Sequence, residues 1–140
     1  YNRGDYATAL EEILPIAEQG NAIAQYNVGQ MYLHGEGVPQ DYAQASKWWH
    51  LAAEQGLAIA QYNLGFMYSS GGGVPQDYAE AVRWYRLAAK QGLAQAQLKL
   101  SARLMASADA KRNWQLSNLK ETLGSLPLVT SQMNYCFRCA

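Results

Sequence analysis

Small and apolar residues recur along this chain at the spacing of helix faces. Val28, Gly29 and Tyr32 stand one and three positions apart, and Leu64 and Gly65 begin the same series again later in the chain. Positions that recur every three or four residues share one side of a helix, with polar residues on the other side. The pattern predicts helices over residues 5–19, 22–34, 41–55, 58–70, 77–91 and 94–106.

This helix pattern is repeated with a period of 36 residues. Residues 24–59 and 60–95 align without a gap and are identical at 24 of 36 positions. A fixed period of this length is typical of stacked repeats, in which each unit buries its apolar face against its neighbours. We therefore expect an all-α array of helix pairs. Arrays of this kind usually bind other molecules and rarely catalyse reactions.

The period also predicts how the chain is divided. It gives a partial unit over residues 1–20, full units over about 21–56 and 57–92, a partial unit with a capping helix over 93–123, and an atypical tail over 124–140. Because the chain begins in the second half of a unit, we expect a fragment or a processed product. The capping helix is placed at 109–123, although no Gly or Pro lies between Leu93 and Leu123, so 94–123 could also form one long bent helix. The tail is either native or an added sequence.

Glycine and aspartate mark where the helices end and restart. Gly35 precedes a Val-Pro pair and can supply the left-handed backbone that ends a helix. Asp41 and Asp77 are suited to cap the helices that follow. Gln44 and Glu80 stand three residues later, as in a capping box with Asp in the Ser/Thr position.

Several large side chains and two glycines recur with the period. We expect the recurring aromatic residues to lie in the core: Trp48, Trp84, Tyr32, Tyr68, Tyr42 and Tyr78. Trp48 and Trp84 occupy the central apolar position of a second helix and are predicted to be buried anchors between units. Gly29 and Gly65 lie in mid-helix, where Gly costs about 1 kcal/mol relative to Ala. Their repetition predicts a neighbouring helix too close for a Cβ atom.

The composition is that of a globular protein with no electrostatic preference. Hydrophobic residues make up 49% of the chain and charged residues 16%, and eleven basic residues balance eleven acidic ones. A neutral chain is a poor match for nucleic acid, which needs a basic stripe. No apolar run is long enough to insert into a membrane. Residues 1–123 contain no Cys, so the compartment cannot be read from cysteine usage.

Few residues suggest chemistry. His34 and His50 are the only histidines, and they form no recognisable ligand set, so we expect no metal site, no cofactor and no catalytic residue. Cys136 and Cys139 form a C-x-x-C motif and leave a thiol–disulfide redox protein as an alternative reading. That motif lacks the strand–helix frame of redox folds. A third reading is a structural array whose exposed ends associate with copies of itself.

The second full unit carries a recognisable motif. Residues 60–92 read AQYNLGFMYSSGGGVPQDYAEAVRWYRLAAKQG, with Leu64-Gly65, Tyr68, Gly71, Gly73-Val74, Asp77, Ala81, Trp84-Tyr85, Ala88-Ala89 and Gly92 as its fixed points. This resembles the Sel-1-like repeat, a relative of the tetratricopeptide repeat, over about residues 5–106. The departures are Trp49, where Tyr is usual, and Pro15, where Leu51 and Leu87 stand in the later units.

The resemblance implies a right-handed α-α superhelix with first helices on the concave side and second helices outside. It also implies an adaptor or scaffold that binds a protein or peptide. Some bacterial members of the family are exported to the envelope, and export to the envelope or periplasm is one expectation for a chain whose compartment the sequence leaves unknown.

The tetratricopeptide pattern, carried onto this chain, predicts the residues that face the groove. They are Tyr26, Asn27, Gln30, Leu33 and His34, then Tyr62, Asn63, Phe66, Ser69 and Ser70, and in the partial unit Leu98, Lys99, Ala102 and Met105. Asn27, Asn63 and Lys99 occupy equivalent positions and are expected to form a row that contacts an extended peptide or a chain terminus. The alternatives are that the asparagines bond to neighbouring helices and that Tyr26, Tyr62 and Phe66 belong to the core.

Overall fold

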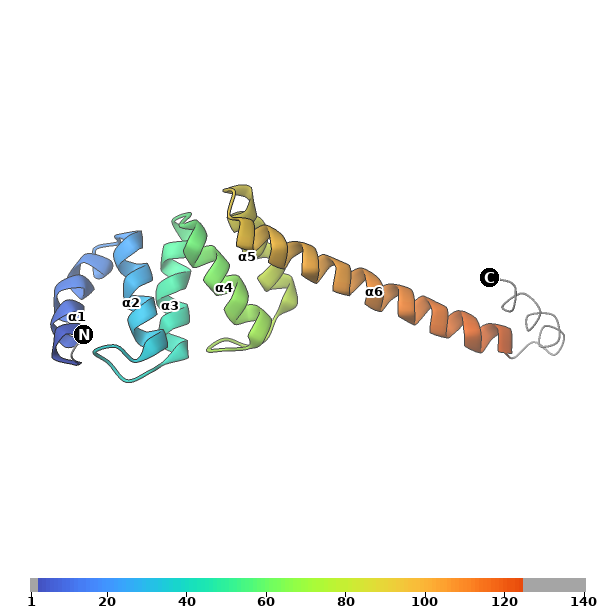
Figure 1. The fold of residues 1–140 in the computed structure, drawn as a ribbon, viewed down its shortest axis with the longest axis horizontal. Helices are drawn as coiled ribbons and strands as arrows, with labels where there is room; N and C mark the ends of the chain where they lie inside the picture. The colour runs from blue at the N-terminus through green and yellow to red at the C-terminus, as the bar shows by residue number, and fades with distance from the viewer. Residues whose placement is uncertain (1–2, 125–140) are drawn as a thin grey trace. The chain divides into compact units, whose positions relative to one another are not determined.

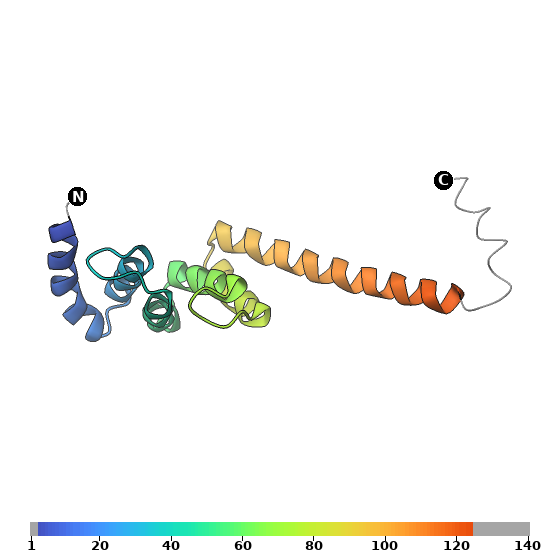
Figure 2. The ribbon, with the colours of Figure 1, turned by 90° about the horizontal axis from the view of Figure 1, so that it is seen from below.

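The computed structural model describes residues 3–124, and every regular element in that range is a helix (Figure 1). The helices are α1 (Arg3–Glu18), α2 (Ala22–His34), α3 (Tyr42–Glu54), α4 (Ala58–Ser70), α5 (Tyr78–Lys90) and α6 (Ala94–Gly124). From α1 to α5, each helix packs against the next one in the chain (Figure 2). The predicted all-α array is confirmed, and α1 begins two residues earlier than expected.

The chain divides into two compact units, residues 1–101 and 102–140. The first contains α1 to α5 and the start of α6, and the second contains the rest of α6. Residues 94–124 form one helix rather than a short helix followed by a separate capping helix. Because no Gly or Pro interrupts this stretch before its last residue, nothing local ends the helix near position 106.

Asp41 and Asp77 cap the second helices as the sequence predicts. The Asp41 side chain accepts a hydrogen bond from the Gln44 backbone N–H at 3.0 Å, and Asp77 accepts from Ala79 and Glu80. The reciprocal half of a capping box does not form, because the Asp41 backbone N–H donates to the Tyr32 carbonyl at 2.9 Å. The cap therefore also ties the loop back to the preceding helix.

The expectation that Tyr42 and Tyr78 belong to the core is wrong. They are 47% and 48% exposed, because each is the first residue of its helix and lies beside the loop. The Gln40 amide donates to the Tyr42 hydroxyl at 3.2 Å and to the Leu33 carbonyl at 2.7 Å. Gln76 makes the same two contacts one unit later. These tyrosines are conserved between the units because they hold the loop in place.

The close approach predicted at the two mid-helix glycines is confirmed. A Cβ atom on Gly29 would lie 2.5 Å from the Trp49 ring, and one on Gly65 would lie 2.9 Å from the Tyr85 ring. In both units the second helix thus presses an aromatic ring onto the backbone of the first helix. The loss of helix propensity at Gly is offset by this contact.

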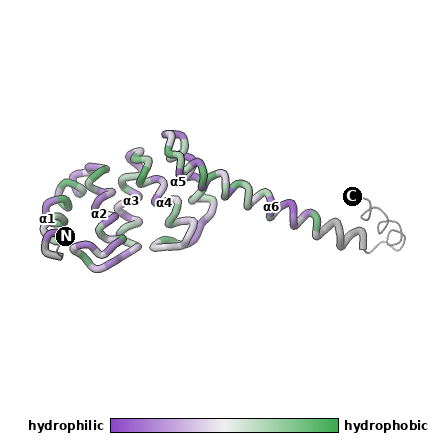
Figure 3. The backbone as a smooth tube through the Cα atoms, viewed as in Figure 1, coloured by the Kyte–Doolittle hydropathy of each residue, from purple (hydrophilic) through white to green (hydrophobic). Residues whose placement is uncertain are grey.

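Alanine and a few large rings make up the core of the array. Of the sixteen buried apolar residues in the part of the chain that the structure describes, nine are alanine, which lets the helices approach closely. Apolar and polar stretches alternate along α1 to α5 (Figure 3). Trp84 is 3% exposed and packs on Ala52, Ala53, Ala60 and Leu64, as predicted.

Trp48 does not match this prediction, because it is only half-buried at the edge of a smaller cluster. The Trp84 ring is covered by the His50 ring at 5.4 Å and by the Arg83 guanidinium at 5.3 Å. The corresponding positions around Trp48 hold Leu14 and Lys47.

Glutamine side chains join successive units through a repeated set of hydrogen bonds. Gln61 is 4% exposed, and its amide donates to the Ala53 carbonyl at 3.2 Å while accepting from Gln91 at 3.0 Å. Gln25 makes the equivalent contacts with Ala17 and Gln55 one unit earlier. Buried amides of this kind need every partner, because an unpaired polar group loses its solvation without compensation.

We expect Gln61→Ala to lower the free energy of unfolding by about 1–2 kcal/mol, since it leaves the buried carbonyl of Ala53 without its hydrogen-bond donor. Gln97→Ala is the matched control, because Gln97 makes the same type of bond to Ala89 but is exposed. Urea denaturation followed by circular dichroism measures both. Equal losses in the two variants would show that the buried network adds nothing beyond a surface hydrogen bond.

Candidate functional site

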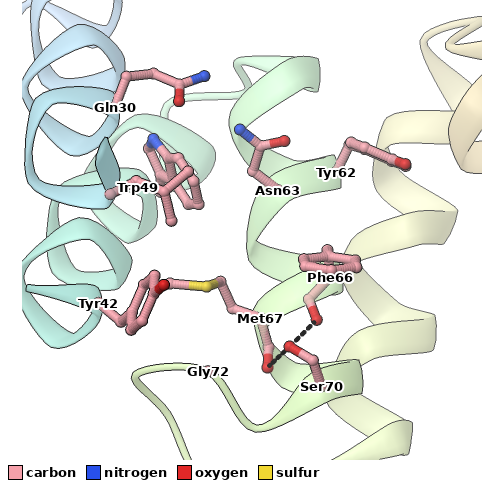
Figure 4. Close-up of a pocket in the computed structure, with 10 residues that line it drawn as sticks. Gln30, Tyr42, Trp49, Tyr62, Asn63, Phe66, Met67, Ser70 and Gly72 are labelled. Atoms are coloured by element: carbon pink, nitrogen blue, oxygen red, sulfur yellow. Dashed lines mark hydrogen bonds between the residues drawn. The ribbon is translucent and has the colours of Figure 1, made fainter. Parts of the chain in front are cut away.

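A cavity of about 490 Å³ lies between the two full repeat units. Its walls come from α2, the second helix α3, the next first helix α4 and the loop that follows α4. The lining residues are Gln30, Leu33, Tyr42, Trp49, Tyr62, Asn63, Phe66, Met67, Ser70 and Gly72. Figure 4 shows Gln30, Trp49 and Asn63 around one part of the cavity, and the Met67 side chain extending from α4 toward Tyr42.

Contacts within the first full unit fix the wall formed by α2 and α3. Trp49 is 2% exposed, and its indole N–H donates to the Tyr26 carbonyl at 3.2 Å. The Tyr26 ring stacks beside Trp49, with 6.3 Å between ring centroids and 21° between planes. Gln30 donates to the Tyr26 hydroxyl. The aromatic wall and the Gln30 amide are therefore held in place before any ligand arrives.

The opposite wall is formed by α4. Phe66 is 51% exposed, and Tyr62 lies against Tyr85 with 5.7 Å between ring centroids. The Ser70 hydroxyl donates to the Phe66 carbonyl at 3.0 Å. Asn63 is half-buried and points from α4 into the space between the units (Figure 4). This wall therefore combines the exposed ring of Phe66 with the amide of Asn63 and the hydroxyl of Ser70. The Ser70 oxygen can still accept a hydrogen bond from a ligand.

The cavity brings together six of the fourteen groove-facing residues predicted from the sequence: Gln30, Leu33, Tyr62, Asn63, Phe66 and Ser70. Tyr26 supports the wall from behind Trp49. Asn27, His34 and Lys99 are exposed and do not line the cavity. The row of Asn27, Asn63 and Lys99 stays a prediction, and only its middle member belongs to this cavity.

Four lining residues were not identified from the sequence: Tyr42, Trp49, Met67 and Gly72. Met67 repeats Met31 at the period, and both are buried. The repetition of Met at this position could have predicted that Met67 is buried, but not that it lines a cavity. Trp49 was noticeable only as a departure from the motif, and it lines the cavity from α3, with its ring against Gly29 in the middle of α2.

The chemistry available in the cavity is that of binding. No Asp, Glu, Lys, Arg or His lines it. Over the described range 3–124, no group of three or more His, Cys, Asp or Glu side chains is placed to hold a metal ion. His50 lies outside this cavity and pairs with Glu54 at 3.2 Å. Apolar rings with a few amide and hydroxyl groups suit a neutral ligand with an apolar side group.

Two copies of the Sel1 repeat model match this chain, over residues 22–57 and 58–93. The chain belongs to the Sel1 repeat family. The matched units correspond to the helix pairs α2–α3 and α4–α5, and residues from both units line the cavity. The Sel1 fold is generally a protein-interaction scaffold, and the family is typically non-catalytic. No curated protein matches the chain.

Solved structures of the family share this architecture. A Sel1 repeat protein from Oxalobacter formigenes is 41% identical with a TM-score of 0.66, covering 69% of this chain and 40% of its own. A protective antigen of uropathogenic Escherichia coli strains is 51% identical with a TM-score of 0.64, covering 66% of this chain and 20% of its own. Helicobacter pylori cysteine rich protein B is 21% identical with a TM-score of 0.59. The match covers 69% of this chain and 70% of that protein, and it supports the fold alone. This chain thus spans less than half the length of the first two.

Two sequence expectations concern residues outside the described range. The C-x-x-C motif at Cys136 and Cys139, and the rest of the atypical tail beyond Gly124, belong to the segment 125–140. Within the described residues, no helix is both long and apolar enough to cross a membrane.

Proposed function

We propose that this Sel1 repeat chain is a non-catalytic interaction module that binds an extended segment of a protein or peptide across α2 and α4. The observation that carries the proposal is the cavity between the two full units, with its uncharged and mainly aromatic lining. Its volume of about 490 Å³ is in the range that accepts a large side chain.

The lining also suggests how such a segment would be held. Phe66, which is 51% exposed, offers ring surface to an aromatic or branched aliphatic side chain, and the buried Trp49 supports the opposite wall. Gln30 and Asn63 each carry an amide that can both donate and accept, which suits the N–H and C=O groups of a peptide backbone. Because Trp49 and Gln30 already have internal partners, little side-chain freedom would be lost on binding.

A peptide selection tests this function directly. Random peptides displayed on phage are selected on the 140-residue chain, and the recovered peptides are synthesised and titrated against variants. We expect Asn63→Ala to weaken binding about tenfold or more, because it removes a two-way hydrogen-bonding group from the cavity. Asn27→Ala is the matched control, since the residue occupies the same helix position one unit earlier and is exposed outside the cavity.

Recovered peptides should be rich in aromatic and aliphatic residues. Equal weakening by both Asn variants would favour the longer row of Asn27, Asn63 and Lys99 over the cavity. Peptides whose binding is unchanged by Asn63→Ala and by Phe66→Ala would show that this cavity is not the binding site.

A further inference from the structure

The three second helices, α1, α3 and α5, carry a graded charge at equivalent positions, of which all but Leu14 and His50 are exposed. Three sets of positions are compared, each with one residue on α1, one on α3 and one on α5, spaced 36 residues apart. They are Glu11, Lys47 and Arg83; Leu14, His50 and Arg86; and Glu18, Glu54 and Lys90. With His neutral, these positions carry a net charge of −2 on α1, 0 on α3 and +3 on α5. The neutral total of the chain therefore conceals a strong asymmetry.

The asymmetry extends to the chain as a whole. Residues 1–56 contain two basic and seven acidic residues, whereas residues 57–140 contain nine basic and four acidic residues. Among the described residues, Glu11 and Glu18 on α1 form no ion pair. Charges that are exposed and unpaired create a field that attracts an oppositely charged surface.

The basic end of the gradient is similarly accessible. Arg83, Arg86 and Lys90 stand three and four residues apart and so share one face of α5, and all three are exposed. Arg83 pairs with Glu80 at 3.2 Å and lies over Trp84, but no ion pair is recorded for Arg86 or Lys90. His50 contacts the same Trp84 ring from α3, so the positions on neighbouring second helices lie side by side.

We propose that the acidic face of α1, formed by Glu11 and Glu18, docks on the basic face of α5 in a second copy of this chain. The two faces have opposite sign and similar helical spacing, and they come from the same layer of repeat positions. Each copy carries both faces. A dimer with two-fold symmetry would therefore form two equivalent contacts, each between α1 of one copy and α5 of the other. Leu51 on α3 is 45% exposed between the two charged ends and would add apolar contact there.

This association is independent of the proposed peptide site. The cavity is lined by residues of α2, α4, the start and middle of α3 and the loop after α4, and none of the charged positions on α1 or α5 contributes to it. A failure of peptide binding would leave the association intact, and the reverse also holds.

Sedimentation equilibrium of two charge-reversed variants tests the proposal. Glu11→Lys/Glu18→Lys makes both ends basic, and Arg86→Glu/Lys90→Glu makes the α5 end mainly acidic. We expect wild-type self-association to weaken about tenfold or more between about 20 and 300 mM NaCl, because exposed charges are screened by salt. Each variant alone should be monomeric at low salt, and an equimolar mixture should associate again.

The matched control is Lys99→Glu/Lys111→Glu, which reverses two exposed charges on α6 and should self-associate as the wild type does. Thermal melts establish that each variant is folded, and the single changes Glu18→Lys and Lys90→Glu replace any variant that is not. A wild type that stays monomeric at low salt, variants that associate on their own, or a mixture that does not associate would each overturn the proposal.

Discussion

Replacing Trp84 by Ala should lower the free energy of unfolding by about 3–5 kcal/mol, the range for a large buried aromatic side chain. The ring is 3% exposed and fills the space between Ala52, Ala53, Ala60 and Leu64, so its removal leaves a cavity that these small side chains cannot close. Its indole nitrogen has no hydrogen-bond partner among the described residues. The stabilisation therefore comes from buried area, shape and ring contacts rather than from a hydrogen bond of the indole nitrogen.

Trp48→Ala is the matched control, because it changes the equivalent residue one unit earlier. Its ring is only half-buried, so we expect roughly half the loss seen for Trp84. Urea denaturation followed by far-ultraviolet circular dichroism gives both values. A loss below about 1 kcal/mol for Trp84→Ala would show that the ring is peripheral to the fold.

Gly73→Ala should destabilise the array by about 3 kcal/mol, because it combines backbone strain with a steric clash. Gly73 has a φ of +75°, and a Cβ atom there would lie 2.2 Å from the carbonyl oxygen of Tyr42. The clashing atom belongs to the backbone at the start of α3, so no side-chain movement relieves it. The loop after α4 would have to lift away from the preceding unit.

Gly56→Ala separates the two contributions. Gly56 has a φ of +92°, but nothing lies within 4 Å of the position of its added Cβ. This control should cost about 1 kcal/mol from backbone strain alone. Thermal and urea denaturation compare the two variants, and equal losses would contradict a close approach of the loop to Tyr42.

The periodic sequence was sufficient to predict the local structure. Asp41 and Asp77 cap helices because an N-terminal carboxylate satisfies free backbone N–H groups, and this requires only a few neighbouring residues. Gly29 and Gly65 were identified as points of close approach because a costly residue recurred at the same place. Both inferences depend on interactions within a single unit, which the repeat specifies twice.

The tertiary structure alone decided how equivalent residues differ. Asn63 lines the cavity because residues of α2 and α3 form its other wall, whereas α1 is the only described helix that precedes α2, and Asn27 is exposed. Trp84 is covered by His50 and Arg83, while Trp48 is not. A repeat makes two positions equivalent in sequence, but burial depends on the elements packed on each side. Because those elements differ along the array, only the packed structure distinguishes a core residue, a cavity wall and an exposed copy of the same side chain.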